Sequence, residues 1–274
     1  MTDATRLVDA ATGARAGAVA SALVSAIGEH TLVVLHSAIP AFGMFPHRLR
    51  EDWLAAVARL ADAGITLALP AFTFSFCKRG WYHFDQSPSE TGLLADWVWR
   101  SGAARRTPHP VYSFAVVGPL KEVCCAWNEL GAFGAGTLFE LFDRVNARIV
   151  FAGATWQSCT QVHRYEELAE VPYRYRKDFA GTADFGAGPG PVCARLCVRD
   201  VALGSTLNYT RPFDRLRREG RILRTKLERG TIESVSSADV SAVCMDLLRE
   251  DPFCMLDDPR LIEQRLALRG HARD

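Results

Sequence analysis

Three side chains suited to proton transfer lie close together in the sequence, after a short apolar run. Thr160, His163 and Glu166 follow the run 149–152, and their spacing predicts a helix that carries all three. Residues three apart on a helix face the same side, so His163 can contact either neighbour and hold a neutral imidazole in one orientation. This pattern predicts a general-base site. A histidine beside a glutamate on a solvated helix face is the alternative interpretation.

The segments that must position these side chains alternate between two patterns. Short runs bounded by proline, glycine or polar turns predict buried strands at 31–35, 65–69, 113–117 and 148–152. Two helices are predicted from apolar residues at helical spacing, namely Trp53, Leu54, Val57, Leu60 and Ala61, then Leu93, Leu94, Trp97 and Val98. The alternation predicts an α/β fold with a mixed, largely parallel sheet flanked by helices, in a single domain spanning 1–274. Ligands are expected at the carboxyl ends of the strands.

The second half of the chain adds weaker patterns. A helix is predicted over 138–146, with Thr137 as its N-cap. The Gly- and Pro-rich stretch 182–191 predicts a loop or hairpin connection, followed by a strand over 192–198. Eight basic and three acidic residues in 211–229 predict a solvated helix and strand, and the last predicted helix spans about 238–248.

Composition excludes several classes of function. The formal net charge of +1 argues against an extended nucleic-acid surface and gives no overall attraction for a polycationic substrate. The N-terminal sequence lacks a signal peptide and no run reaches the roughly 18 apolar residues that cross a bilayer, so we expect a cytoplasmic protein without membrane association. The eight cysteines lack the spacing of a zinc site, so we expect reduced thiols and no metal.

Several motifs occur in a characteristic order: TLVVLHSAIPAFG from Thr31, LALPAFTFSF from Leu67, RRTPHPVYSFAVVG from Arg105 and GAFGAGTLF from Gly131, followed by CTQVHRYE and VPYRYRKDF. With these motifs the chain resembles the aminoglycoside 3-N-acetyltransferase family from about Ala14 to Phe179, and more faintly to about Pro252. The resemblance implies an acetyl-coenzyme A-dependent N-acetyltransferase with that family's own α/β fold.

The resemblance implies where the coenzyme binds. Its contacts are expected at His36, Ser37, Ala38, Thr73, Thr107, Val111 and Ser113. Ser37 closes the first predicted strand, where a hydroxyl and exposed backbone N–H groups can donate to a phosphate. Thr73 corresponds to a threonine near the pantetheine arm. His109 lies between two prolines of the loop that carries Thr107, and it either serves this loop as a coenzyme site or acts as a structural hydrogen-bonding group.

The acceptor is expected to bind along 81–90. Tyr82 offers a flat face for a sugar, and Asp85 or Glu90 could pair with an ammonium group. Glu90 could equally stabilise the start of a helix. The Gly-rich segment 131–137 has neither a P-loop ending nor a dinucleotide fingerprint, which argues against ATP and NAD.

We therefore expect direct transfer of an acetyl group from acetyl-coenzyme A to a small-molecule amine, an aminoglycoside or a related amino sugar. His163 acts as the base, Glu166 orients it, and Thr160 donates near the tetrahedral intermediate or the sulfur. Three alternatives remain open: acylation of another amine in natural-product or glycan biosynthesis, a non-catalytic acyl-coenzyme A-binding protein, and a thioester hydrolase that uses Cys159 with His163. A homodimer is also left open.

Overall fold

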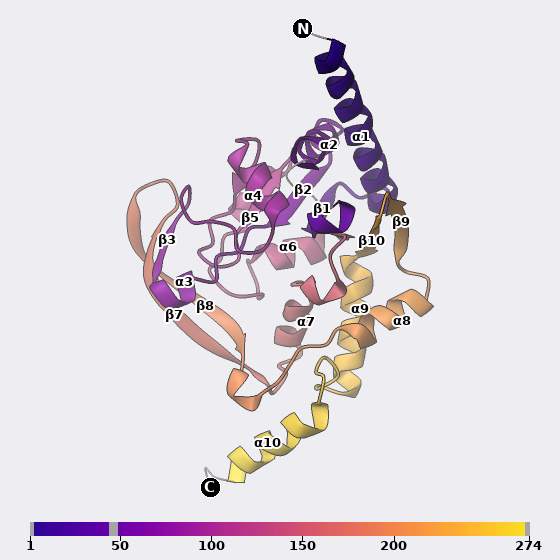
Figure 1. Ribbon diagram of the computed structural model, residues 1–274. Coiled ribbons are helices and arrows are strands. Elements are labelled where there is room, and N and C mark those ends of the chain that lie inside the picture. Colours follow the sequence, from indigo (N-terminus) through magenta and orange to yellow (C-terminus); the bar gives the residue numbers. More distant parts are fainter. Residues whose placement is uncertain (1–2, 44–48, 272–274) are drawn as a thin grey trace.

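The computed structural model describes residues 3–43 and 49–271 (Figure 1). The strands are β1 (Leu32–Ser37), β2 (Thr66–Pro70), β3 (Trp81–His83), β4 (Arg105–Arg106), β5 (Phe114–Val117), β6 (Arg148–Ala152), β7 (Arg174–Asp184), β8 (Pro189–Arg199), β9 (Leu223–Leu227) and β10 (Gly230–Ser236). The helices are α1 (Asp3–Ile27), α2 (Arg50–Asp62), α3 (Phe76–Arg79), α4 (Leu93–Arg100), α5 (Lys121–Ala126), α6 (Leu138–Arg144), α7 (Val162–Leu168), α8 (Thr210–Arg218), α9 (Ser237–Glu250) and α10 (Pro259–His271). Short 3₁₀ turns are η1 (Ile39–Phe42), η3 (Trp156–Ser158) and η4 (Val201–Leu203).

The larger sheet has seven strands in the order β4-β5-β2-β1-β6-β10-β9. β1 pairs parallel with both β2 and β6, whereas β5 and β10 run antiparallel to their central neighbours. The expected α/β fold with a mixed sheet is confirmed, and its parallel pairing lies at the centre. Because β1, β2 and β6 are parallel, their carboxyl ends meet at one edge, where ligands bind in such sheets.

Side chains alternate between the two faces of this sheet along its strands, and apolar residues lie on both faces. Helices therefore cover both faces. Val33 and Leu35 belong to a core formed with α1, α2 and α4. Leu32 and Val34 belong to a second core that includes α6 and the smaller sheet. A third cluster joins β6 and β10 to α7, α8 and α9. Helix α7 therefore packs against the sheet and neighbouring helices through this third cluster, and its Tyr165 is fully buried.

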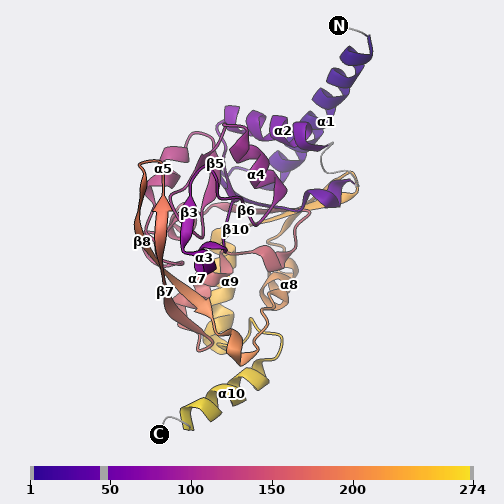
Figure 2. The ribbon, with the colours of Figure 1, turned by 60° about the vertical axis from the view of Figure 1, so that its left-hand side comes forward.

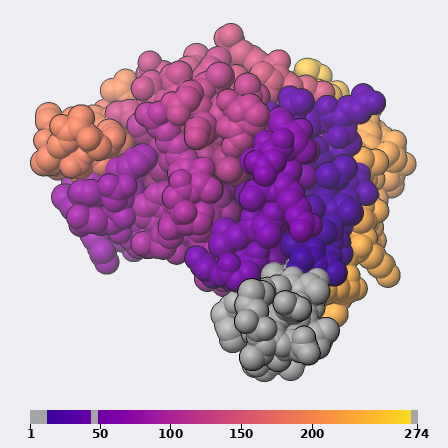
Figure 3. All heavy atoms as spheres, turned by 90° about the horizontal axis from the view of Figure 1, so that it is seen from above, coloured from indigo at the N-terminus to yellow at the C-terminus, as the bar shows by residue number. Residues whose placement is uncertain are grey.

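The smaller sheet contains β3, β7 and β8. β7 and β8 form a long hairpin in which Arg174 is the partner of Arg199 at the base and Asp184 is the partner of Pro189 near the tip. The hairpin stands at one side of the molecule in two views (Figures 2 and 3). The predicted connection over 182–191 is confirmed as a hairpin, although its outer residues belong to the strands.

Some elements differ from the sequence prediction. Neither α1 nor α10 was predicted, and in α1 the apolar residues are mostly alanine and valine spread around the helix rather than along one stripe. Thr137 precedes α6, but its hydroxyl donates to the Gly134 carbonyl at 2.7 Å and does not cap the helix. Within residues 3–43 and 49–271, no helix is both long and apolar enough to cross a membrane.

Candidate active site

The loop that carries the acid–base residues leaves β6 through Gly153. This residue has a φ of 69°, in the left-handed region that favours glycine, and a Cβ there would lie 2.6 Å from the Cβ of Ala41. The loop can therefore pass directly beside the turn that follows β1. As a result Ala154 and Ser158 share one pocket with Ser37 at the carboxyl end of β1.

Thr160 lies outside the helix that carries His163 and Glu166, so the prediction of a single helix for all three is wrong. Cys159 has a ψ of 84°, which is not helical, and α7 begins only at Val162. The Thr160 carbonyl accepts the His163 backbone N–H at 3.1 Å, and its hydroxyl donates to the Ser158 carbonyl at 3.3 Å. The catalytic role of this hydroxyl stays a prediction.

His163 and Glu166 form the close pair that their spacing predicts. The Nδ1 atom of His163 lies 2.8 Å from Oε2 of Glu166, whose side chain is fully buried. The imidazole is 20% exposed. Glu166 also accepts a hydrogen bond at 2.8 Å from the Tyr173 hydroxyl and one at 2.7 Å from Nη2 of Arg174. A buried carboxylate with these three donors is held in a single orientation.

Two further groups meet the same ring nitrogen. Nη2 of Arg174 lies 2.7 Å from Nδ1 of His163, and the Tyr209 hydroxyl lies 2.9 Å from it. The guanidinium can only donate and the carboxylate can only accept, so Nδ1 cannot satisfy both at once. We assign the proton to Nδ1, because this tautomer gives Glu166 a charge-assisted hydrogen bond and leaves Arg174 its own bond to the carboxylate. Nε2 is then free to accept a proton.

Burial and the neighbouring charges keep the His163 imidazole neutral and the Glu166 carboxylate ionised. Burial and the Arg174 guanidinium lower the pKa of His163, and Glu166 only partly opposes this shift. Burial would raise the pKa of Glu166, but the hydrogen bond from His163 and the charge of Arg174 outweigh it and the pKa is lowered. At neutral pH the site therefore holds a neutral base beside a buried ion pair.

The residues that complete this cluster had no assigned role at the level of the sequence. Tyr173 and Arg174 lie in the VPYRYRKDF motif, so their position pointed to the family but not to Glu166. Tyr209 is 46 residues from His163 and reaches it only because α8, which it precedes, packs against α9 and the η3 turn in the folded chain. Phe133, from the Gly-rich segment, places its ring 5.3 Å from that of His163.

Two of the predicted coenzyme residues line a pocket at the carboxyl edge of the central strands. His36 and Ser37 share this pocket with Thr91 and Ser158. His36 stacks on Phe151 at 5.2 Å, and its buried Nε2 has no hydrogen-bond partner among the described residues. The Ala38 N–H donates to the Ala152 carbonyl at 2.9 Å, so this N–H is already engaged.

The other four predicted coenzyme residues are buried, and two of them contact a buried arginine; they are Thr73, Thr107, Val111 and Ser113. Arg106 is 1% exposed and donates to the hydroxyls of Ser113 and Thr73 at 2.9 and 2.8 Å. The Thr107 hydroxyl accepts the Phe114 N–H at 2.8 Å, and Val111 is fully buried. These side chains thus hold neighbouring loops together, and their contact with a coenzyme stays a prediction.

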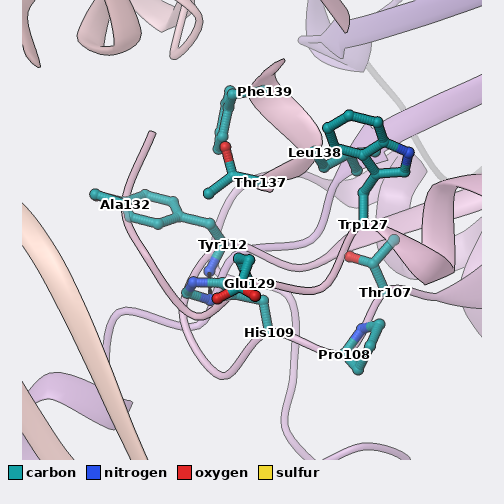
Figure 4. Close-up of a pocket in the computed structure, with 10 residues that line it drawn as sticks. All are labelled: Thr107, Pro108, His109, Tyr112, Trp127, Glu129, Ala132, Thr137, Leu138 and Phe139. Atoms are coloured by element: carbon teal, nitrogen blue, oxygen red, sulfur yellow. Dashed lines mark hydrogen bonds between the residues drawn. The ribbon is translucent and has the colours of Figure 1, made fainter. Parts of the chain in front are cut away.

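His109 is a structural hydrogen-bonding group in this fold. Its Nδ1 accepts the N–H groups of Val111 and Tyr112 at 3.0 and 2.8 Å, and its Nε2 donates to the Gly131 carbonyl at 3.1 Å. Figure 4 shows it among the residues that line a small pocket between the 107–112 loop and segment 127–139. A protonated ring would direct a second N–H at two backbone donors, so the fold selects the neutral form.

Acid is expected to destabilise the protein through two buried imidazoles. Burial lowers the pKa of both His36 and His109 from 6.5 to about 4. Between these values the unfolded chain binds protons that the folded chain cannot, so stability is lost as the pH falls, by on the order of 1 kcal/mol per pH unit for each ring. Urea unfolding of wild type and His36→Phe at pH 7.5, 6 and 5 should show a shallower fall for the variant. Equal slopes would contradict this explanation.

The structure separates the three residues predicted to bind the acceptor. Tyr82 is fully buried and its ring packs under the Arg106 guanidinium at 5.2 Å, so it belongs to the core and offers no open face for a sugar. Glu90 accepts the Ser75 N–H at 3.1 Å and stabilises the start of α3, not of a following helix. Asp85 is exposed, and its role stays a prediction.

All eight cysteines are free thiols, as predicted, and six of them are buried. Burial raises the pKa of Cys159 to about 12, so this thiol is protonated at neutral pH. No group of three or more His, Cys, Asp or Glu residues in the described part of the chain could hold a metal ion.

Comparison with known proteins identifies the family and the fold of this chain. The sequence profile of the aminoglycoside 3-N-acetyltransferase family matches residues 6–249. Aminoglycoside N(3)-acetyltransferase III of a Salmonella species is 36% identical over 100 residues, which cover 35% of this chain and 35% of that protein. The protein of the same name from Serratia marcescens is 34% identical over 104 residues, covering 36% of this chain and 39% of that protein. The matched segment thus spans a little over a third of these relatives.

Solved structures resemble the fold over most of its length. The coenzyme A complex of AAC-IIIb has a TM-score of 0.69 at 15% identity, covering 86% of this chain and 96% of that one. AAC-VIa bound to sisomicin has a TM-score of 0.70 at 15% identity, with coverages of 86% and 97%. The fold is therefore that of the α/β aminoglycoside acetyltransferases. The chain belongs to the aminoglycoside 3-N-acetyltransferase family, whose named members are acyltransferases.

Proposed function

We propose that this protein transfers an acetyl group from acetyl-coenzyme A directly to an amine of an aminoglycoside or related amino sugar. The observation that carries this proposal is the His163–Glu166 pair: a partly exposed imidazole whose Nδ1 is 2.8 Å from a fully buried carboxylate. Such a pair leaves Nε2 as the proton acceptor. A cytoplasmic location, where acetyl-coenzyme A is available, is part of the proposal.

The reaction needs one base and no covalent enzyme intermediate. The acceptor nitrogen attacks the thioester carbonyl carbon while Nε2 of His163 removes a proton from that nitrogen. The tetrahedral intermediate then collapses, the C–S bond breaks, and the coenzyme leaves as a thiolate. The proton held by His163 neutralises this thiolate, which yields an amide and free coenzyme A. Glu166 stabilises the imidazolium formed between these steps.

Coenzyme binding in the His36–Ser37 pocket is supported by its position and its chemistry. The pocket lies at the carboxyl ends of β1 and β2 and borders the loop that leads to α7. The Ser37 hydroxyl in this pocket suits a phosphate or amide group of the coenzyme, whereas the hydroxyls of Thr91 and Ser158 already donate to the carbonyls of Pro70 and Thr155 at 2.9 and 2.6 Å. A solved structure with the same fold contains bound coenzyme A, which supports coenzyme binding by this chain.

Thiol release provides the direct test of this function. The protein is incubated with acetyl-coenzyme A and a panel that includes sisomicin, gentamicin, glucosamine and glucosamine 6-phosphate, and each product is weighed by mass spectrometry. We expect thiol release only with an amine, and a mass gain of one acetyl group on that amine. Release without an amine would favour the hydrolase alternative. Coenzyme binding without any turnover would favour the non-catalytic alternative.

Replacing Ser37 with alanine should weaken acetyl-coenzyme A binding several-fold, by about 1 kcal/mol, because one hydroxyl contact is lost while the rest of the pocket is unchanged. Calorimetry measures this change. Ser25→Ala, which removes an exposed hydroxyl on α1 that donates to the Ser21 carbonyl, is the control and should bind normally. An unchanged affinity in Ser37→Ala would mean that the coenzyme phosphates lie elsewhere.

Replacing Cys159 with serine should leave most of the activity, since Cys159 is fully buried and its thiol is protonated at neutral pH. A thiol nucleophile replaced by a hydroxyl would instead lose activity by orders of magnitude. Intact-mass measurement during turnover should detect no acetylated protein. An acetyl group trapped on Cys159, together with an inactive serine variant, would replace direct transfer by a covalent mechanism.

A further inference from the structure

Two arginines lie opposite each other at the base of the β7–β8 hairpin. Arg174 on β7 and Arg199 on β8 are direct partners in the antiparallel register. Side chains of such partners point to the same face of the sheet. Since Arg174 reaches Glu166 and His163, Arg199 lies on the face of the hairpin that carries the base. Figure 2 shows this end of the hairpin beside α7.

A second contact ties Arg199 to the site. Its Nη1 donates to the Ser205 carbonyl at 2.6 Å. The segment from Ser205 continues to Tyr209, whose hydroxyl meets Nδ1 of His163. The Arg199 guanidinium is thus bound to the same segment, 205–209, that brings the Tyr209 hydroxyl to His163. Its charge also contributes to lowering the pKa of His163.

The other arginines on this face have carboxylate partners. Arg174 pairs with Glu166 at 2.7 Å, Arg176 approaches Glu167 at 3.8 Å, and Arg195 pairs with Asp178 at 2.8 Å. Arg199 pairs with no carboxylate in the described part of the chain. Its neighbour Asp200 is held by Arg269 at 2.6 Å. Arg199 therefore carries a half-buried positive charge beside the base that the described residues do not neutralise.

We propose that Arg199 binds a carboxylate or phosphate carried by the acceptor amine. The inference rests on the proposed acetyl transfer and narrows its acceptor to an amino sugar, or a similar amine, that bears an anionic group. A polycation would meet two arginines and one carboxylate around His163, an excess of like charge. An anion paired with the planar guanidinium gains charge-assisted hydrogen bonds and directs the amine of the same molecule toward Nε2.

The test compares glucosamine with glucosamine 6-phosphate in wild type, Arg199→Ala and Arg195→Ala. Wild type should show the higher kcat/KM with the phosphorylated sugar. Arg199→Ala should raise the KM for that sugar by about 10- to 100-fold relative to its effect on the KM for glucosamine, the range expected for a hydrogen-bonded charge pair. A change common to both sugars reports the contacts of Arg199 with the segment beside His163 and not the anion. Arg195→Ala removes an exposed arginine from the same strand and face, and should change neither KM.

Two results would overturn this inference and leave the proposed acetyl transfer standing. One is equal or better turnover of glucosamine or sisomicin, with no effect of Arg199→Ala on any acceptor. The other is a weaker coenzyme A affinity in Arg199→Ala with unchanged acceptor KM, which would assign the guanidinium to a coenzyme phosphate. If coenzyme A binds and no amine is acetylated, the proposed function falls, and the inference falls with it.

Discussion

Replacing His163 with alanine is expected to lower the rate of acetyl transfer by about three to four powers of ten, near the upper end of what general acid–base catalysis contributes. Without this imidazole, α7, whose residues are all described, carries no histidine to act as the base. Affinity for coenzyme A should stay within twofold, because the ring acts on the acceptor. Single-turnover assays measure the rate, and calorimetry measures the affinity.

His30→Ala is the matched control for this experiment. His30 lies before β1, at the opposite end of the strand from the site, and its Nδ1 is 3.1 Å from the Ile27 carbonyl. This variant should transfer acetyl groups at the wild-type rate. Turnover by His163→Ala within a few-fold of wild type would remove the base from the mechanism.

Replacing Glu166 with glutamine is expected to cost both rate and stability. The amide can donate to Nδ1 of His163 and so favour the wrong tautomer, an effect that costs up to about 10⁴-fold when the orienting carboxylate of a serine protease is altered in the same way. The change also leaves the buried Arg174 without its anionic partner, and breaking such a pair destabilises a protein by about 3 kcal/mol or more.

Glu170→Gln serves as the control, since Glu170 is an exposed carboxylate that follows α7. Its rate and its urea midpoint should match those of wild type. A Glu166→Gln variant with wild-type rate and stability would show that the buried carboxylate neither orients the imidazole nor stabilises Arg174.

The central architecture follows from local features of the sequence. The apolar runs at 31–35, 65–69, 113–117 and 148–152 correspond to β1, β2, β5 and β6, because short buried strands need continuous apolar side chains. The pairing of His163 with Glu166 follows from helical spacing alone. Both predictions depend on neighbours in the chain.

Features that depend on contacts between residues far apart in the sequence could not be predicted from local patterns. Tyr209 joins His163 across 46 residues, and nothing in its local sequence marks it. Thr73 and Ser113 matched the family as coenzyme residues, but their hydroxyls receive hydrogen bonds from Arg106, which the sequence could not place between them. Tyr82 looked like an exposed aromatic wall, yet it packs in the core of the smaller sheet.

The pH dependence of kcat/KM tests the assignment of His163 as base most directly. Because burial and Arg174 lower its pKa, the acid limb in wild type should lie below pH 6.5, where protonation removes the base. Glu166→Gln should move this limb lower, since the carboxylate favours the imidazolium, and Arg174→Met should move it higher, since a repelling charge is removed. Any limb set by the acceptor amine stays fixed. An acid limb at the same pH in wild type and both variants would contradict the assignment.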